Sequence, residues 1–308
     1  MTPLKDSLNK AIARREKMFK ITNALRLVNG KGDNLDGLLI DCYHRHIHVQ
    51  MLHERWHPYK EQIRHILTSV MPVDYLIVKT RRDLSIQAEV LVGTDSQTIV
   101  EEHNLNFKVN LDEGLNCGLF LDMRRNRLML QEDCKGKKVL NCFAYTCAFG
   151  VYARAGGARD VINTDISPKI LERGRINYQL NGFLSAPGEF VKADSSFYLK
   201  RAFKKDNRFD VIILDPPSFA RHGTQVFQVK RDLPPLIAMA GAVLNPGGQL
   251  LISTNYSEIS YADLERMLKR NLNGRRVESV QRIGQDDDFV GSNSFKESFL
   301  VGLWVKFL

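Results

Sequence analysis

Three aspartates at the ends of apolar segments are the residues of this sequence best placed to bind a polar ligand. Each closes a segment typical of a buried strand: DVINTD (160–165), EFVKAD (189–194) and FDVIILD (209–215). Ligands of open α/β sheets bind beyond the carboxyl ends of the strands, near the point where the strand order reverses. The spacing therefore predicts that Asp165 accepts hydrogen bonds from ribose hydroxyls, that Asp194 contacts the adenine side, and that Asp215 lies beside them. For each aspartate taken alone, a strand-end turn or a helix cap is the alternative.

The loop after the first strand of this series indicates which nucleoside ligand fits. It reads FAYTCAFG (143–150) and lacks GxGxxG, the glycine-rich turn that lets a backbone approach a pyrophosphate. A dinucleotide is therefore disfavoured, and an adenosine cofactor without phosphate, of which S-adenosylmethionine is the common one, fits better. The stretch from Asn141 to Cys147 is expected on the methionine side. The expected cofactor residues are Asn141, Phe143, Tyr145, Thr146, Cys147, Asp165, Ile166, Asp194, Ser195 and Asp215.

The turn DPPSF (215–219) could hold a flat base next to such a cofactor. Two prolines fix the turn and remove two amide donors, so that nearby carbonyl groups stay available as acceptors. A carboxylate can accept a hydrogen bond from a ring or exocyclic N–H, while an aromatic ring contacts the π-face of the base. We therefore expect Asp215, Pro216 and Phe219 to act in catalysis. A rigid turn with a core phenylalanine is the structural alternative.

Strands and helices alternate throughout the segment that contains these residues. The expected strands are 138–143, 160–165, 189–194, 209–215, 249–255 and a closing strand at 298–307, and a turn occupies 245–248. The expected helices are 148–156, 167–182, 228–244 and 261–272. Such alternation predicts an α/β fold with a doubly wound, mostly parallel, Rossmann-like sheet.

The N-terminal third has a different pattern. An amphipathic helix opens it, and strand-like runs at 46–52, 74–80 and 88–93 follow, with a helical stretch near 57–70. Residues 101–122 suggest a hairpin around Gly114 that leads into a helix at 123–134. We therefore expect a small α/β module, residues 1–103, and a larger α/β domain, residues 104–308.

Composition is that of a soluble protein with an affinity for polyanions. The formal net charge is +9, and basic residues cluster at 124–138 and 200–208. Basic clusters favour nucleic acids, although a solvated basic surface is the alternative. No segment resembles a signal peptide or a membrane span, and the five cysteines lack CxxC spacing. The sequence thus predicts a cytoplasmic location, no membrane partner and no structural zinc site.

Several motifs, in order, resemble the class I methyltransferases of large-subunit ribosomal RNA. They are KVLNCFAYTCAFGVYARAGGA (138–158), VINTDIS (161–167), NYQLNG (177–182), LDPPSF (214–219) and NPGGQLLISTNYS (245–257). Two upstream stretches, 25–43 and 111–127, resemble the central module and the bridging hairpin of that family. The resemblance covers nearly the whole chain. It implies S-adenosylmethionine as cofactor, a role in rRNA processing, binding of the RNA substrate by the module of residues 1–103, and a base of 23S ribosomal RNA as methyl acceptor.

Three departures from the family pattern bear on the chemistry. We expect the N-terminal PUA domain of many members to be absent here, because the chain begins too late to contain one. Cys147 and Ala148 stand where the family commonly has Gly-Gly, and Asn255 stands where the cytosine-5 branch carries the cysteine of Ser-Cys-Ser. Carbon 5 of cytosine normally requires a thiolate, whereas guanine N7 has an exposed lone pair. Guanine N7 is therefore favoured, also because FQVKRDL (227–233) resembles that branch; cytosine-5 methylation and a non-catalytic RNA-binding or ribosome-assembly factor are alternatives.

The other candidate sites have simpler interpretations. Alternating histidines at 44, 46 and 48, with two more at 53 and 57, predict an exposed polar strand face, with phosphate contacts or a metal site as alternatives. The basic residues 14, 15 and 17 predict a solvated helix face, and the aspartates 286–288 a polar loop. Cys142 and Cys147 are expected to be small buried residues. Asp122 and Arg124 are expected to border the cofactor, and no metal ligands are predicted.

Overall fold

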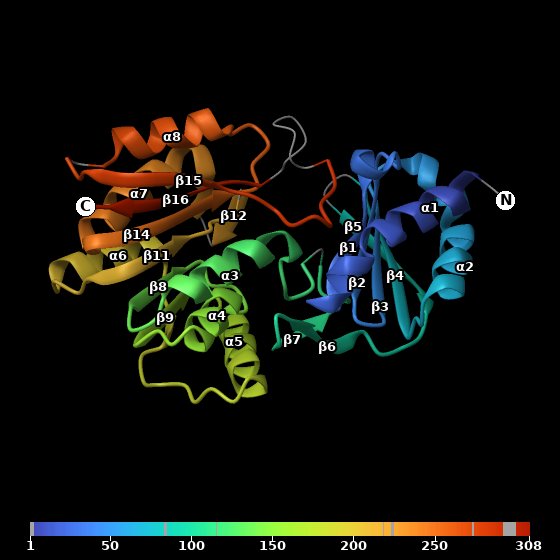
Figure 1. Cartoon of the computed structure of the whole chain (residues 1–308), viewed down its shortest axis with the longest axis horizontal. Coiled ribbons are helices and arrows are strands. Elements are labelled where there is room, and N and C mark those ends of the chain that lie inside the picture. Colours follow the sequence, from blue (N-terminus) through green and yellow to red (C-terminus); the bar gives the residue numbers. More distant parts are fainter. Residues whose placement is uncertain are drawn as a thin grey trace. The chain divides into compact units, whose positions relative to one another are not determined.

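The chain folds into two compact units. The computed structural model describes residues 3–82, 85–114, 116–217, 219–222, 225–272, 274–291 and 300–308 (Figure 1). The first unit comprises Met1–Arg124 and Gln285–Glu297, and the second comprises Arg125–Gly284 and Ser298–Leu308. The first unit thus extends beyond the boundary expected near residue 104 and includes a segment from late in the chain. Within the described ranges, no helix combines the length and the apolar character needed to cross a bilayer.

The second unit is built on a seven-stranded sheet in the order β10-β9-β8-β11-β14-β16-β15. The strands are β8 (Lys138–Cys142), β9 (Asp160–Asp165), β10 (Phe190–Lys192), β11 (Phe209–Leu214), β14 (Leu244–Thr254), β15 (Val277–Ile283) and β16 (Val301–Phe307). The first five in spatial order pair in parallel, and β16 pairs antiparallel with both of its neighbours. This arrangement confirms the predicted doubly wound sheet with its closing strand.

The turn expected at residues 245–248 lies within β14. Leu244 pairs with Phe209 and Gln249 with Val211, so a five-residue step in β14 faces a two-residue step in β11. The extra residues form a bulge in which Gly247 takes a φ of 69°, a left-handed conformation that favours glycine. The prediction of a turn was right in its chemistry, but β14 begins before that turn.

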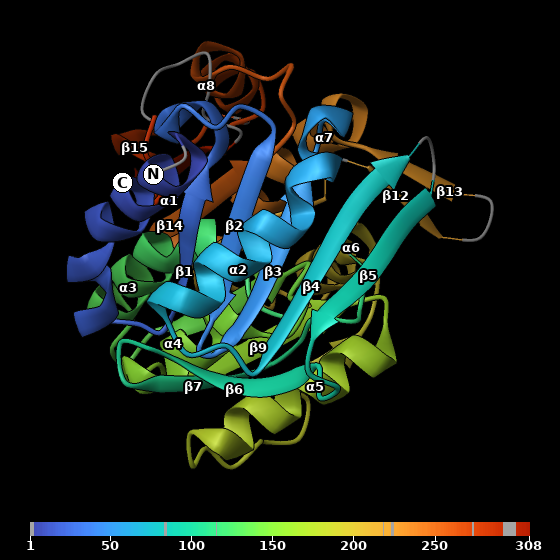
Figure 2. The same cartoon turned by 90° about the vertical axis from the view of Figure 1, so that its right-hand side faces the viewer.

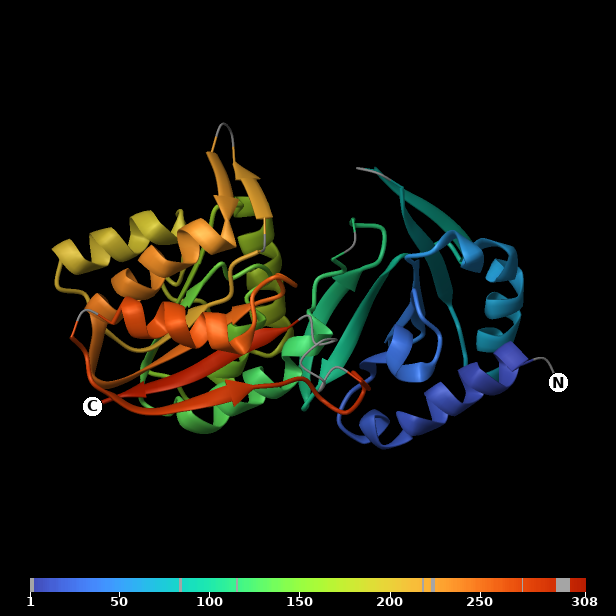
Figure 3. The same ribbon diagram turned by 90° about the horizontal axis from the view of Figure 1, so that it is seen from above.

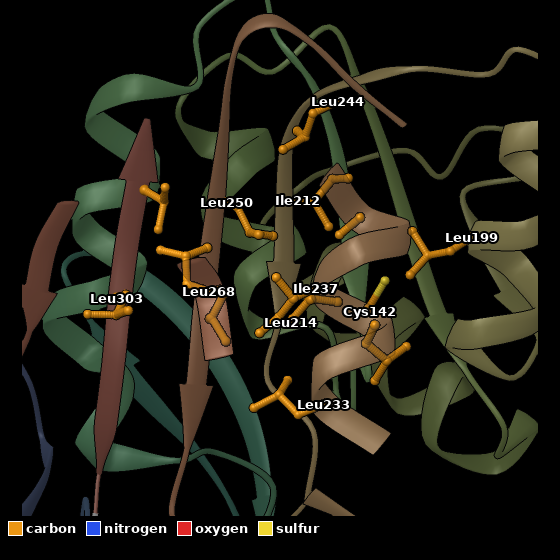
Figure 4. Packing of buried hydrophobic residues seen from close by; sticks show 14 of the residues in the cluster. Cys142, Leu199, Ile212, Leu214, Leu233, Ile237, Leu244, Leu250, Leu268 and Leu303 are labelled. Carbon is orange, nitrogen blue, oxygen red and sulfur yellow. The ribbon is translucent and has the colours of Figure 1, made fainter. Parts of the chain in front are cut away.

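Helices cover both faces of this sheet. Figure 1 shows α6 (Ser195–Lys204), α7 (Val229–Val243) and α8 (Tyr261–Arg270) on one face, and α3 (Arg124–Asp133), α4 (Ala148–Ala155) and α5 (Pro168–Leu180) on the other. Leu199, Leu233 and Leu268 of the first group are buried in one core with Ile212 and Leu250 of the sheet (Figure 4). Burial of such leucine-sized side chains, at about 2 kcal/mol each, provides most of the free energy that holds helices on a sheet.

A small hairpin stands out from the second unit. It consists of β12 (Phe219–His222) and β13 (Gln225–Gln228), which pair antiparallel, with Phe219 opposite Gln228 (Figure 3). The hairpin follows directly on the DPP turn and precedes α7. No strand was predicted here, because the sequence shows neither a long apolar run nor a clear alternation.

The first unit contains a five-stranded sheet in the order β1-β2-β3-β4-β5. The strands are β1 (Ala24–Asn29), β2 (Leu38–Tyr43), β3 (His46–Met51), β4 (Tyr75–Arg82) and β5 (Ser85–Val92). Helices α1 (Pro3–Arg14) and α2 (Lys60–Val70) cover one face (Figure 2), where their apolar residues join those of the strands in a second core. The short 3-10 helices of this unit are η1 (Glu16–Lys20), η2 (Gly30–Asp33), η3 (Glu54–Tyr59) and η4 (Leu121–Met123).

The hairpin of this unit lies earlier than predicted. Strands β6 (Gln97–Glu102) and β7 (Leu105–Asn110) are joined by His103 and Asn104, whose φ angles are 49° and 62°. Two left-handed residues suit the twist of a two-residue hairpin turn. The turn expected at Gly114 therefore lies after the hairpin and not within it.

Buried charges in the first unit overturn two expectations. Arg15 is fully buried, and its guanidinium donates to both carboxylate oxygens of Asp33 at 2.6 and 2.7 Å. Asp288 is also fully buried, and its carboxylate accepts from Arg124 at 3.0 Å. The solvated helix face was thus wrong for Arg15, the polar loop was wrong for Asp288, and Arg124 belongs to this ion-pair network.

The histidines of β3 are also buried, contrary to the expected exposed face. A ring nitrogen of His46 lies 2.9 Å from the carbonyl of Asp95, and His48 is 1% exposed. Burial lowers the pKa of His48 to about 4, since the charged ring would lose its hydration. In the parts of the chain that the structure describes, no group of His, Cys, Asp and Glu has metal-binding geometry.

Candidate functional site

The three aspartates of the sequence motif lie at one edge of the second unit's sheet. Strands β10, β9, β8 and β11 are neighbours and run parallel, so their carboxyl ends meet at the same edge. Asp165 is the last residue of β9, Asp194 follows β10 by two residues, and Asp215 follows β11 directly. The chain continues from β8 to β9 on one side and reaches β11 on the other. The strand order therefore reverses at β8, where ligands of such sheets bind.

The loop that follows β8 has an unusual backbone. Phe143, Tyr145 and Cys147 take φ angles of 55°, 49° and 60°, in the left-handed region that non-glycine residues rarely adopt. Each such residue costs roughly 1–2 kcal/mol, and strain of this kind clusters at ligand sites. The amides of Ala144 and Cys147 are satisfied by the carbonyls of Thr164 and Ala144, at 2.9 and 2.8 Å. Sequence analysis did not predict these conformations, because none of the three residues is glycine.

Asp165 connects this loop to the start of α5. Its two carboxylate oxygens accept from the amides of Tyr145 at 3.1 Å and Ser167 at 2.9 Å. The side chain of Ser167 in turn caps α5 by accepting from the amide of Ile170. Partial burial raises the pKa of Asp165, although the amide hydrogen bonds, including one from Ile166, oppose the shift. A carboxylate has about four acceptor positions, so the amides take only part of its capacity.

Buried amides behind the loop hold it in place. Asn141 is 1% exposed, and its side chain donates to Asn163 at 2.9 Å, which donates to the hydroxyl of Tyr178 at 3.0 Å. Asn177 of α5 donates to the carbonyl of Thr146 at 2.9 Å. Asn141, expected to bind the cofactor, is therefore placed where its side chain positions other residues. Sequence reasoning missed Asn163, Tyr178 and Asn177, although NYQLNG belongs to the quoted motifs.

Asp194 and Ser195 begin α6. Asp194 is exposed and is the N-cap of the helix, since its carboxylate accepts from the amide of Phe197 at 2.9 Å. Ser195 is buried, and its hydroxyl accepts from the amide of Phe143 at 3.3 Å. The helix cap, which was the alternative for Asp194, is thus present. Ser195 joins α6 to the β8 loop.

Asp215 is oriented by a residue at the end of β14. The hydroxyl of Ser253, which is fully buried, donates to the Asp215 carboxylate at 2.6 Å. Pro216 is buried beside it. Ser218 and the side chain of Phe219 lie outside the described residues, but the ring of Phe227 lies 5.7 Å from that of Phe143. Ser253 precedes Asn255 in the motif NPGGQLLISTNYS, and sequence reasoning assigned it no role.

The two cysteines near this edge have the character of buried thiols. Cys142 and Cys147 are both fully buried, as expected. Burial raises the pKa of Cys142 to about 12 and that of Cys147 well above its ordinary range. Because only the thiolate is a good nucleophile, neither side chain is suited to covalent catalysis at neutral pH.

The two basic clusters differ in exposure. Arg124 and Arg127 are buried, so the first cluster does not form one exposed surface. The second cluster is exposed throughout: its members are Lys200, Arg201, Lys204, Lys205 and Arg208. Of the two, only the second cluster, on α6 and the residues just after it, is exposed at every position.

Comparisons with known proteins agree with this geometry. The family model described as "S-adenosylmethionine-dependent methyltransferase" matches residues 66–291. Ribosomal RNA large subunit methyltransferase I of Photobacterium profundum is 32% identical over 287 residues, 89% of this chain and 72% of that protein. The protein of the same name from Tolumonas auensis is 30% identical, over 92% of this chain and 75% of that protein. The crystal structure of SMU.776 complexed with SAH superposes with a TM-score of 0.89 at 26% identity, covering 98% of this chain and 80% of that one. The chain belongs to the family of S-adenosylmethionine-dependent methyltransferases.

Proposed function

We propose that this methyltransferase modifies a base of large-subunit ribosomal RNA. Support for the RNA comes from relatives named for that activity, of which the chain spans 72% and 75%. Support for a base as acceptor comes from one observation: Asp215, followed by two prolines, lies at the same sheet edge as Asp165. The cofactor and the acceptor can therefore meet where the strand order reverses.

The residues at this edge fit S-adenosylmethionine. The edge offers carboxylates and a loop with left-handed backbone but no glycine-rich phosphate loop. Such a set of groups suits an adenosine without phosphate. Asp165 would hold the ribose hydroxyls with its remaining acceptor positions. Asp194, with Ile166 and Ser195, would line the adenine side. The stretch from Asn141 to Cys147, including Thr146, would line the methionine side, with the half-buried Phe143 and Tyr145 as its most accessible members. When bound, the cofactor supplies a methyl group on a positively charged sulfonium centre.

Asp215 would position the acceptor base, together with Pro216 and Phe219. The Ser253 hydroxyl fixes one oxygen of the carboxylate, so the carboxylate presents its acceptor positions in a defined direction. An N–H group of the base can donate to it, and the prolines leave neighbouring carbonyls without competing amide donors. Holding donor and acceptor in line in this way is itself a large part of catalysis.

Guanine N7 is the acceptor atom that we propose. A covalent route to carbon 5 of cytosine needs a thiolate. Cys142 and Cys147 are buried with raised pKa values, and Asn255 stands where that branch has its cysteine. Guanine N7 needs no proton removed, because its lone pair is exposed. Transfer moves positive charge onto the base, and a carboxylate at Asp215 would stabilise that charge.

Tritiated methyl transfer to ribosomal RNA from a strain lacking the protein tests the function, with the labelled nucleoside identified by mass spectrometry. We expect 7-methylguanosine from the wild-type chain. We expect Asp215→Ala to abolish transfer while the cofactor dissociation constant changes by less than roughly tenfold, about 1.4 kcal/mol. The matched control is Asp206→Ala. Asp206 is an exposed aspartate just after the C-terminal end of α6, and this variant should retain transfer.

Two outcomes would contradict parts of this proposal. Retained transfer by Asp215→Ala would remove that residue from the mechanism. If 5-methylcytidine carried the label and 7-methylguanosine carried none, guanine N7 would be refuted as the acceptor. The proposal of methyl transfer to RNA would still stand.

A further inference from the structure

Helix α6 has one buried face and one exposed basic face. Ser195, Leu199 and Ala202 are 0–3% exposed and pack toward the sheet. The opposite face carries four side chains at helical spacing i, i+3, i+4 and i+7: Phe197, Lys200, Arg201 and Lys204. All four are exposed, and Phe197 is 62% exposed. We call these four residues the α6 stripe.

The positive charge of the α6 stripe is uncompensated. The helix sequence SSFYLKRAFK contains no acidic residue. Some other exposed cations of the second unit have carboxylate partners, for example Arg159 with Asp160 and Lys230 with Glu258. Among the residues that the structure describes, the three cations of the stripe form no ion pair. Such a surface attracts a polyanion, because no internal carboxylate competes for it.

The stripe begins at the proposed transfer site. Asp194 caps α6, and Ser195 contacts the amide of Phe143 in the β8 loop. Phe197 therefore lies on the first turn of the helix, close to the sheet edge that carries the aspartates. From Phe197 to Lys204 the helix rises by roughly 10 Å, at about 1.5 Å per residue. An extended ligand could thus leave the site along the helix.

We propose that the α6 stripe binds a single-stranded segment of the RNA substrate that flanks the target base. Phe197 stacks on a base next to the target, and the three cations contact phosphates along the strand. Aromatic rings that stack bases beside a positively charged track are the usual means of holding single-stranded nucleic acid. This inference rests on the proposed function and extends it, since it names how the RNA is held beside the acceptor position.

Two pairs of variants of the full chain test it. Lys200, Arg201 and Lys204 are changed together to Gln, and Arg266, Lys269 and Arg270 on the exposed face of α8 are changed likewise as the charge-matched control. Phe197→Ala is compared with Phe203→Ala, a phenylalanine of the same helix that is equally exposed, at 61%, but lies off the stripe. Binding of fluorescein-labelled oligouridine is measured against salt, and methyl transfer is measured with ribosomal RNA.

Log affinity falls with log salt, and we expect this fall to be shallower in the α6 triple variant, by about 2 in slope. Each phosphate of a single strand that a cation neutralises contributes roughly 0.7 to the steepness. Phe197→Ala should weaken binding by roughly 5- to 150-fold without changing that slope. Both should raise KM for RNA more than they lower kcat, and cofactor affinity should be unchanged. The α8 triple variant and Phe203→Ala should bind as the wild type does.

Equal losses in the α6 and α8 triple variants would overturn the proposal, because net charge alone would then explain them. Unchanged binding in the α6 triple variant or in Phe197→Ala would overturn it as well. The proposed function fails in a different way, namely if the wild-type chain transfers no methyl group to RNA. The salt slopes with oligouridine would still decide whether the stripe binds RNA.

Discussion

Gly174 and Cys147 are neighbours in space, and neither is the residue type that its own backbone conformation favours. Gly174 lies within α5, where alanine has the higher helix propensity, and Cys147 has the left-handed φ of 60° that suits glycine. A Cβ at position 174 would lie 2.9 Å from the Cβ of Cys147 and closer still to its Sγ. Contacts between carbon atoms are normally about 3.5–4.0 Å. We therefore predict that the effect of Gly174→Ala depends on residue 147.

The magnitude follows from two opposing effects. Overpacking a buried site costs about 1–3 kcal/mol, and the upper end applies here because both Cβ atoms are fixed by backbone. Replacing a helical glycine by alanine stabilises by about 1 kcal/mol. Gly174→Ala should thus lower the free energy of unfolding by about 2 kcal/mol in the wild type. In the Cys147→Gly background the clash with residue 147 is absent, so the same change should cost about 3 kcal/mol less, which is a coupling energy of about 3 kcal/mol.

Urea unfolding followed by the fluorescence of Trp304 measures this coupling. Trp304 lies on β16 of the second unit, and a Trp56→Phe background removes the only other tryptophan, which lies in the first unit. Gly241→Ala in α7 is the control, because its Cβ would meet only a side-chain carbon of Arg275 at an ordinary 3.7 Å. It should stabilise equally in both backgrounds.

The contact with Phe190 at 3.2 Å is present whether residue 147 is cysteine or glycine, so it cancels from the coupling energy. A loss of similar size for Gly174→Ala in both backgrounds would refute this account. The left-handed conformation of the β8 loop would then not depend on the space that Gly174 leaves for Cys147.

Two further predictions concern the first unit. Arg15→Met should lower its free energy of unfolding by about 3–5 kcal/mol, because the Asp33 carboxylate would be left buried without its main partner. Arg14 lies on the exposed side of the same carboxylate, so Arg14→Met should cost less than about 1 kcal/mol. Equal costs in Trp56 fluorescence would contradict this assignment. The pKa of His48, lowered to about 4 by burial, means that the unfolded chain takes up a proton below about pH 6.5 while the folded one does not. The free energy of unfolding of this unit should therefore fall as pH drops from about 6.5 to 4, by up to roughly 1.4 kcal/mol per pH unit. The fall should be less steep in His48→Gln. An NMR titration midpoint of the His48 ring near 6.5 would disprove the shift.

The central strands of the second unit's sheet were predictable because they are buried on both faces, whereas the exposed edge strand β15 was not predicted. Segments such as DVINTD and FDVIILD are short, apolar and bounded by turns, and the observed β9 spans the predicted residues 160–165. Parallel strands have all their carboxyl ends at one edge. Once alternation with helices indicated a parallel sheet, the common edge for Asp165, Asp194 and Asp215 followed from chain order alone.

The first unit was less predictable because it buries charges on its sheet. Arg26 of β1 donates to Asp41 of β2 at 2.8 Å, and both residues are largely buried. In a sequence, an arginine and an aspartate within apolar runs look like exposed positions, so these two strands were not predicted. The same reasoning placed Arg15 on a solvated face, since its partner Asp33 is 18 residues away and nothing local identifies it.

The conformation of the β8 loop could not be predicted for a related reason. A left-handed φ at Cys147 conflicts with the preference of cysteine, so local rules predict an ordinary backbone there. The cost is offset by contacts from other elements: Asn177 of α5 binds the Thr146 carbonyl, Asp165 binds the Tyr145 amide, and Gly174 leaves room for the cysteine sulfur. These contacts connect residues that lie 20 to 31 positions apart in the sequence. A sequence can therefore indicate which residues form this edge, whereas the shape that the edge presents to a ligand is set by the helix packed behind it.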